Sequence, residues 1–173
     1  LGICGGLQML GEALIDLHAI DDPLGGNAPG LGLLPLVTAF EPDKLLQPTR
    51  ARFAALGETS GPWAALSGVA FEGYEIHHGF TRLAAEQGEP LSTGGAAMGW
   101  REGRAMGSYL HGLLASDAWR SAFLNQVRRD RGFPELPIHV ADPLEQRLQR
   151  WAEHLQRSLR PGAWARILGA ARP

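Results

Sequence analysis

The feature that most constrains this chain is a glycine-rich turn around Cys4, its only cysteine. The run Gly2-Ile3-Cys4-Gly5-Gly6 has the G-x-C-x-G form of a nucleophile elbow, with Cys where the motif usually has Ser. Small residues two positions before and two after the nucleophile avoid a clash between neighbouring backbones. The pattern predicts a buried strand that ends at Cys4 and a helix that begins directly after it.

Such a turn gives Cys4 the surroundings of a reactive thiol. The following helix directs its N-terminus at the sulfur, which favours thiolate over thiol. The amide N–H of Gly5 is then placed to stabilise an oxyanion on an attacked carbonyl. The alternative is an inert cysteine buried in a glycine-rich turn. A single cysteine allows no disulfide within the chain and argues against a thiolate zinc site.

Composition excludes several function classes. The 173 residues, 45% of them hydrophobic and 20% charged, are typical of one globular domain with a core. A net charge of -2 indicates no nucleic-acid or membrane surface, and no phosphate-binding G-x-x-x-x-G-K-[ST] run occurs. Without a signal peptide or an apolar run of about 20 residues, a cytoplasmic protein is expected. Because the chain begins at Leu1 inside an expected strand, we interpret it as a piece of a longer protein.

The first half of the chain predicts a short series of elements. Apolar residues at helical spacing from Leu7 to Leu17 predict a helix. Residues 25–32, rich in Gly, predict a loop, and the apolar residues 33–40 predict a short strand. Residues 41–67 are ambiguous. Alternating side chains from Val69 to Ile76 predict a strand that ends at His77.

The second half predicts a hairpin followed by two helices. Met98–Arg101 and Ala105–Leu110 are expected to be strands around the turn at Glu102-Gly103. Ser116 or Asp117 can cap a helix running to about Arg131, which Gly132 would end. Asp142-Pro143 is a second helix start. An apolar stripe then suggests docking onto the domain body, through Leu144, Leu148, Trp151, Leu155 and Leu159.

His111 is the candidate partner of Cys4. It follows an apolar strand and precedes Gly112, so it should emerge at a strand's carboxyl end, where open α/β sheets carry their ligand sites. An imidazole there can take the Cys4 proton and later protonate a leaving ammonia. The alternative is a hydrogen-bonded or exposed loop histidine.

His77 and His78 are adjacent, so a strand would direct them to opposite faces. That argues against both binding one metal, and no metal site is expected. Contact between one of them and a substrate is the better interpretation, with Gly79 allowing close approach. The remaining histidines, His18, His139 and His154, are interpreted as structural or solvated.

Gly2-Ile3-Cys4-Gly5-Gly6-Leu7-Gln8-Met9-Leu10-Gly11 resembles the nucleophile motif of class I glutamine amidotransferases. Tyr74-Glu75-Ile76-His77-His78-Gly79 and Gly107-Ser108-Tyr109-Leu110-His111-Gly112 narrow the resemblance to the branch of cobyric acid synthases and cobyrinic acid diamide synthases. Residues 30–35 and 113–119 fit cobyric acid synthases best. The likeness spans about residues 1–132, in the right order.

The resemblance implies a fold and a domain plan. The implied class is α/β, a flavodoxin-like, open, mostly parallel sheet with helices on both faces, truncated at its N-terminus. Residues 1–132 would form the amidotransferase domain without its first strands, and residues 133–173 a helical extension packed on it.

The resemblance also implies an activity. This domain would hydrolyse L-glutamine and pass ammonia to an N-terminal synthetase domain of the same protein, which is absent from this sequence. There, ATP and magnesium would activate carboxylates of adenosylcobyrinic acid diamide, in cobalamin (vitamin B12) biosynthesis. No cofactor is implied for the domain in hand.

Site roles follow from matching positions. Cys4 matches the nucleophile, Gly5 an oxyanion donor and His111 the base. Gln8 matches a glutamine-contacting position, and 74–79 a segment that binds the amino-acid end of glutamine, which makes His77, His78 and Gly79 candidates. Many class I members have Glu two residues after the histidine, where this chain has Leu113. The group that orients His111 is therefore unassigned, with Glu75, Asp117 or a backbone carbonyl as candidates.

Two other functions remain open at the level of sequence. One is the glutaminase subunit that amidates a peptidoglycan lipid precursor, which shares the cysteine elbow and also lacks that Glu. The other is a non-catalytic domain that binds a partner. It would predict loss of the cysteine or the histidine, and Cys4 and His111 are both present.

Overall fold

The structure is a computed structural model. It describes residues 1–55, 61–84, 89–90, 92–93, 97–137 and 144–160, with positions 162, 163, 166 and 169 beyond them. The chain divides into two compact units, Leu1–His139 and Val140–Pro173. The first unit contains every predicted site residue, and the second contains helix α3, Leu144–Ser158.

A small sheet carries the cysteine turn. Its order is β1-β9-β8-β6, and β1 runs parallel to β9 while the other neighbours are antiparallel. The strands are β1 (Gly2–Ile3), β6 (Glu89–Pro90), β8 (Gly99–Glu102) and β9 (Ala105–Ser108). The pairing of Ile3 with Ser108 fixes the end of β1, and so the position of Cys4, against β9.

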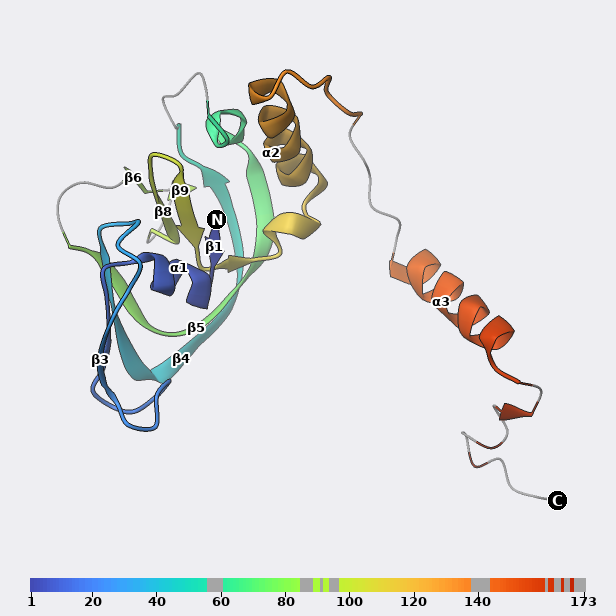
Figure 1. Cartoon of the computed structure of the whole chain (residues 1–173), viewed down its shortest axis with the longest axis horizontal. Coiled ribbons are helices and arrows are strands. Elements are labelled where there is room, and N and C mark those ends of the chain that lie inside the picture. The colour runs from blue at the N-terminus through green and yellow to red at the C-terminus, as the bar shows by residue number, and fades with distance from the viewer. Residues whose placement is uncertain are drawn as a thin grey trace. The chain divides into compact units, whose positions relative to one another are not determined.

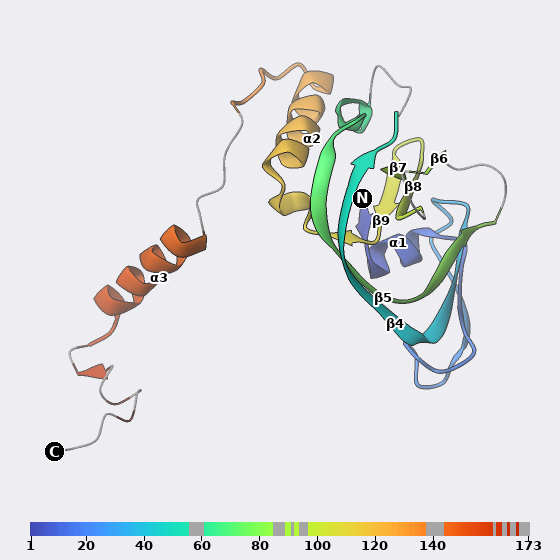
Figure 2. The ribbon, with the colours of Figure 1, turned by 180° about the vertical axis from the view of Figure 1, so that it is seen from behind.

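A second, longer sheet forms the other wall of the site. Its order is β10-β5-β4-β2-β3, with β7 also paired to β4. The strands are β2 (Ala13–Asp16), β3 (Gly26–Pro29), β4 (Leu36–Phe53), β5 (Ala70–Leu83), β7 (Ser92–Thr93) and β10 (Leu110–His111). Figures 1 and 2 show β4 and β5 as a long curved pair, with α1 on its inner side. This curvature brings the middle of β5 next to the cysteine turn.

The two α-helices described in the first unit lie on opposite faces of β9. Helix α1, Gly5–Leu10, contacts one face, where a Cβ on Gly107 would lie 2.3 Å from the Leu7 side chain. Successive residues of a strand point to opposite faces. Met106, the neighbour of Gly107, accordingly joins the other core cluster with Trp119 of α2, Asp117–Asp130. Short 3-10 turns at Ala64–Leu66 and Leu113–Ala115 complete this second core.

The expected α/β class, with open sheets and helices on both faces, is confirmed. The expectation of a mostly parallel sheet is wrong for the described strands, because only β1–β9 and β2–β4 are parallel among their pairings. Short connections explain the difference. Parallel neighbours need a crossover of about a dozen residues or more, whereas β8 and β9 are joined by the tight turn at Gly103.

Several predicted boundaries were wrong in the first forty residues. The helix expected from Leu7 to Leu17 ends at Leu10, and Ala13–Asp16 is strand β2. Gly11 passes so close to β4 that a Cβ on it would lie 2.6 Å from the Leu36 carbonyl oxygen. The chain therefore leaves the helix and pairs between β3 and β4, so that β3 occupies part of the expected loop at 25–32.

Later elements agree better with the prediction. The strands expected at 33–40 and 69–76 are present, but as β4 and β5 they continue well beyond those limits. The Ser116 hydroxyl caps α2 by accepting a hydrogen bond from the backbone N–H of Trp119, and Gly132 takes a φ of 73° after its end. The predicted start at Asp142-Pro143 lies outside the described residues, and α3 is described from Leu144.

Helix α3 presents a mostly apolar stripe that is exposed. Leu144, Leu148, Trp151 and Leu155 are between 45% and 73% exposed. Docking of this stripe on the first unit stays a prediction. Among the helices of the described ranges, none combines the length and the apolar character that crossing a membrane requires.

Candidate active site

Cys4 sits at a strained corner between β1 and α1. Its backbone has φ 54° and ψ −116°, a region that L-residues rarely adopt, and its N–H donates to the Ser108 carbonyl of β9 at 2.8 Å. Strain of this kind costs about 1–3 kcal/mol and clusters at functional sites. A Cβ on Gly2 would lie 2.4 Å from the Gly6 carbonyl oxygen, whereas the Cβ position of Gly6 is open. The predicted strand-to-helix turn at Cys4 is confirmed, and of its two flanking glycines Gly2 is the one with no room for a side chain.

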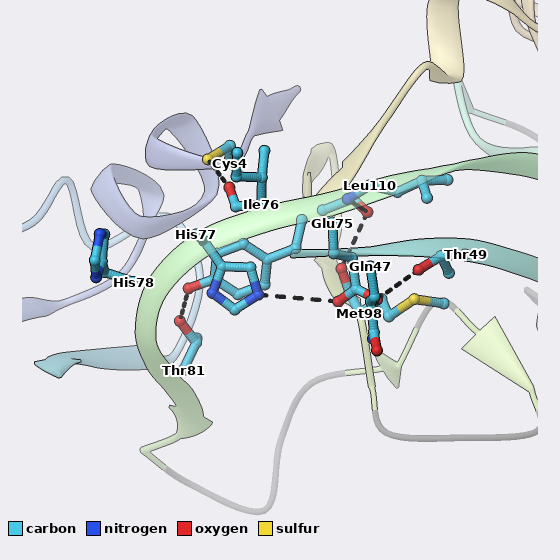
Figure 3. Close-up of polar contacts among 12 residues, drawn as sticks. Cys4, Gln47, Thr49, Glu75, Ile76, His77, His78, Thr81, Met98 and Leu110 are labelled. Atoms are coloured by element: carbon cyan, nitrogen blue, oxygen red, sulfur yellow. Dashed lines mark hydrogen bonds and ion pairs between the residues drawn. The ribbon is translucent and has the colours of Figure 1, made fainter. Parts of the chain in front are cut away.

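The thiol of Cys4 faces strand β5. Its Sγ donates to the Ile76 carbonyl oxygen at 3.4 Å, as Figure 3 shows. This contact links two segments that are 72 residues apart in the sequence. The second predicted motif therefore lies directly beside the nucleophile motif.

A pocket of about 330 Å³ opens beside the thiol. It is lined by Cys4, Gly5, Gln8, Ile20, Asp21, Phe40, Lys44, Ile76, His77, His78 and His111. All predicted site residues except Gly79 are among them. A larger pocket, of about 470 Å³, has neither cysteine nor histidine among its lining residues, so the chemistry points to the smaller one.

His111 is held by strand pairing and by an aromatic ring. It lies on β10 opposite Tyr74 of β5, and the two rings stack with centroids 4.9 Å apart. Its Nε2 is buried and has no hydrogen-bond partner among the described residues. In the tautomer that carries its proton on Nδ1, an imidazole offers such a nitrogen as a proton acceptor. The prediction that His111 follows a strand was nearly right, since it is the last residue of a two-residue strand.

The carboxylates proposed to orient His111 have other partners. Glu75 accepts hydrogen bonds from Gln47 at 3.0 Å and Thr49 at 2.8 Å, and it lies 3.9 Å from His77 Nε2 (Figure 3). Asp117 pairs with Arg120. Stacking on Tyr74 and the β10–β5 register are therefore the described constraints on the His111 ring.

His77 is a buried histidine packed between two side chains. Only 9% of its side chain is exposed, its ring stacks on Tyr109 at 3.7 Å, and its Nδ1 has no partner in the described part of the chain. Burial lowers the pKa of His77 below the ordinary 6.5 and outweighs the opposing attraction of Glu75. His77 is therefore neutral at pH 7.

His78 and Gly79 hold the β4–β5 pair in shape. The His78 ring points away from the His77 ring, as predicted for neighbours on a strand (Figure 3), and its Nδ1 lies 3.2 Å from the Glu41 carbonyl oxygen. Gly79 has φ 80°, and a Cβ on it would lie 2.2 Å from the Ala39 carbonyl oxygen. The close neighbour of Gly79 is thus the β4 backbone, and the predicted approach of a substrate at Gly79 stays a prediction.

Gln8 ties the cysteine helix to strand β5 and to Tyr109. Its side-chain N–H₂ donates to the His78 carbonyl and to the Tyr109 hydroxyl, each at 3.2 Å. The Tyr109 hydroxyl also bonds Thr81, and burial raises the pKa of Tyr109. Tyr109 was missed as a site residue because it carries no catalytic signature; only its place beside His111 could have indicated it.

The loop after β2 supplies the last wall of the pocket. Asp16, only 5% exposed, accepts backbone hydrogen bonds from Ile20, Asp21 and Asp22 at 2.8–2.9 Å. Burial alone would raise the pKa of Asp16, but these bonds outweigh it and the pKa lies below the ordinary 3.8. No group of three His, Cys, Asp or Glu able to hold a metal occurs in the ranges that the structure covers.

A thiol at a strained strand-to-helix turn and an imidazole with an unpartnered nitrogen line one pocket, which makes this pocket the candidate active site. The comparison with protein families agrees, because residues 1–119 match the CobB/CobQ-like glutamine amidotransferase domain. The match covers more than half of the chain, and the chain belongs to this family.

Comparison with individual curated proteins gives a more specific similarity than the family match. The chain is 45% identical over its whole length to the cobyric acid synthase of Methylibium petroleiphilum, of which it covers 32%. Over 125 residues, 68% of the chain, it is 59% identical to the cobyric acid synthase of Leptothrix cholodnii and covers 24% of that protein. The chain thus spans between a quarter and a third of these relatives, approximately.

The buried state of His77 predicts a loss of stability in mild acid. Because the folded-state pKa lies below 6.5, the neutral form is favoured in the fold, and its stabilisation is lost as the pH falls from 6.5 through the lowered value. Replacing His77 by Gln should flatten this loss, measured as melting temperature against pH. Asp16 affects stability in a separate pH range, below 3.8, because its folded-state pKa is lowered and its stabilisation is lost only as the carboxylate becomes protonated. An unchanged slope in His77→Gln would contradict the assignment.

Proposed function

We propose that this domain hydrolyses L-glutamine, with Cys4 as nucleophile, His111 as general acid and base, and Gly5 as an oxyanion donor. The observation that carries the proposal is that the strained Cys4 elbow and the unpartnered His111 imidazole line one pocket. Membership of the glutamine amidotransferase family supports the same chemistry.

The first half of the reaction forms a thioester. His111 takes the thiol proton of Cys4, and the thiolate attacks the side-chain amide carbon of glutamine. The amide oxygen becomes an oxyanion that the Gly5 N–H stabilises. The protonated His111 then gives its proton to the amide nitrogen, the C–N bond breaks, and ammonia leaves. The product is a γ-glutamyl thioester on Cys4.

Water completes the cycle. His111 takes a proton from a water molecule, whose oxygen attacks the thioester carbon. The C–S bond breaks, glutamate leaves, and the proton held by His111 returns to the sulfur. Gln8 supports the site by holding α1 against β5 and Tyr109. His77 and His78 supply part of the wall where the amino-acid end of glutamine would lie.

The wider role follows from the relatives. We propose that residues 1–132 act as the amidotransferase domain, with 133–173 as a helical extension, within a cytoplasmic enzyme. Ammonia would pass to a synthetase domain that uses ATP and magnesium to amidate the corrin carboxylates of adenosylcobyrinic acid diamide, in cobalamin biosynthesis. The names of the curated relatives favour this role over amidation of a peptidoglycan lipid precursor.

Labelling with 6-diazo-5-oxo-L-norleucine, an electrophilic glutamine analogue, tests the proposal. We expect modification at Cys4 in the full chain, located by mass spectrometry of peptides, with loss of N₂ and formation of a thioether. Excess L-glutamine should protect the thiol, and Cys4→Ala should take up no label. Absence of labelling in the unaltered chain would contradict the proposal and favour a non-catalytic domain.

A further inference from the structure

Two opposite charges line the pocket without taking part in the proposed chemistry. They are Asp21, on the loop after β2, and Lys44, the only lysine of the chain. Both side chains belong to exposed residues, so water solvates them when the pocket is empty. Neither residue was among the predicted site residues.

An irregularity in β4 sets the position of Lys44. The β4–β5 register shifts between Ala39 and Lys44, after which Lys44 pairs with His78. Pro42, inside the shifted segment, has no N–H to give to the ladder. Bulges of this kind re-aim side chains and are common next to active sites. The shifted segment of β4 lies opposite Gly79 of β5, and Lys44 and His78, which pair just after it, both line the pocket.

A buried carboxylate sets the position of Asp21. Asp16 accepts the backbone N–H groups of Ile20, Asp21 and Asp22, which closes the loop into a fixed turn. The same loop approaches the shifted β4 segment, where His18 Nε2 lies 3.7 Å from a carboxylate oxygen of Glu41. The loop that carries Asp21 therefore meets the segment next to Lys44.

Within the fold, neither of these charged side chains has a described partner. Among the described residues, no hydrogen bond or ion pair engages the side chain of Asp21 or Lys44. In the same pocket, His77 is 91% buried, as only 9% of its side chain is exposed, and its Nδ1 has no described partner. Buried polar atoms without partners require an explanation, and a bound polar ligand is one.

We propose that Lys44 binds the α-carboxylate and Asp21 the α-ammonium group of the substrate amino acid. This inference rests on the proposed glutaminase function. A zwitterionic α-amino acid carries one group for each of these side chains, and two methylene groups separate its α-carbon from the amide carbon that Cys4 attacks. The pair thereby selects amides that carry an intact amino-acid end.

Substrate analogues separate the two contacts. Glutaramate is glutamine without the ammonium group, and 4-aminobutanamide is glutamine without the carboxylate. Charged hydrogen bonds at a solvated site are worth about a factor of ten in affinity. Lys44→Met should therefore weaken L-glutamine and glutaramate about 10-fold and leave 4-aminobutanamide unchanged. Asp21→Asn should weaken L-glutamine and 4-aminobutanamide about 10-fold and leave glutaramate unchanged.

The measurement is the dissociation constant of each compound, by calorimetry, on the full chain carrying Cys4→Ala so that no thioester forms. Matched controls remove the same charges nearby, outside this pocket. Asp22→Asn neutralises the residue next to Asp21, and Arg50→Gln removes a positive charge from the same strand as Lys44. Both controls should bind all three compounds as the parent does.

The outcomes separate the inference from the function on which it rests. If the unaltered chain is labelled at Cys4 but Lys44→Met and Asp21→Asn bind the three compounds like the controls, the inference is wrong and the proposed function stands. An inverted pattern, with Lys44→Met weakening 4-aminobutanamide, also overturns it. If the Cys4→Ala parent does not bind L-glutamine and the unaltered chain is not labelled at Cys4, both fail together.

Discussion

Replacing Cys4 by alanine is expected to abolish glutamine hydrolysis while leaving ammonia-dependent amidation in a protein that also contains the synthetase part. Alanine keeps the Cβ and the backbone of the elbow but has no sulfur to attack the amide. Without a thioester, no ammonia is released from glutamine, whereas free ammonia bypasses this step. Product formation with glutamine and with ammonium chloride, measured on the same preparation, gives the comparison.

A second variant of Cys4 separates the loss of the thiol from the relief of backbone strain at this position. Cys4→Gly also lacks the thiol, but glycine adopts a φ of 54° freely. Relief of about 1–3 kcal/mol of strain exceeds the roughly 0.5–1 kcal/mol of added chain entropy in the unfolded state. Cys4→Gly should therefore melt at or above the temperature of Cys4→Ala and be equally inactive with glutamine. Equal loss of the glutamine and ammonia reactions would contradict a role confined to glutaminase chemistry.

The parts of the site that the sequence predicted are those with local signatures. Gly2 and Cys4 identify an elbow because the backbone there tolerates few residue types, and His111 follows a recognisable strand. The opposite wall has no such signature. Lys44 enters through a shift in the β4–β5 register, and Asp21 through a turn closed by Asp16. Both depend on pairings between distant segments, which one sequence does not display.

The errors in the fold have the same origin. Ala13, Leu14 and Leu17 match helical spacing as well as strand spacing, because a short apolar run fits both periods. The contact between Gly11 and Leu36, and the pairing of β2 with β3 and β4, decide in favour of a strand. The same holds for β4, whose length follows from its ladder with β5 rather than from its own ambiguous residues.

The choice of His111 as base has to be weighed against His77, because both imidazoles line the pocket. His77 turns its Nε2 towards Glu75 at 3.9 Å and is enclosed by Tyr109, and burial lowers its pKa. Each ring keeps one buried nitrogen without a described partner, Nδ1 in His77 and Nε2 in His111. A free nitrogen therefore does not separate the two, and the lowered pKa of His77, which makes it the weaker base, favours His111.

Replacing His111 by asparagine is therefore expected to slow thioester formation by roughly 10²- to 10⁴-fold, the usual contribution of a positioned acid–base group. Asparagine can keep contact with Tyr74 but cannot exchange a proton near neutral pH. The measurement is the rate of ammonia release in a single turnover. His77→Asn, the matched control, keeps the imidazole at position 111 and should slow this rate far less than His111→Asn does. A His77→Asn variant slowed by about 10²-fold or more, beside a His111→Asn variant that keeps the parent rate, would transfer the base to His77.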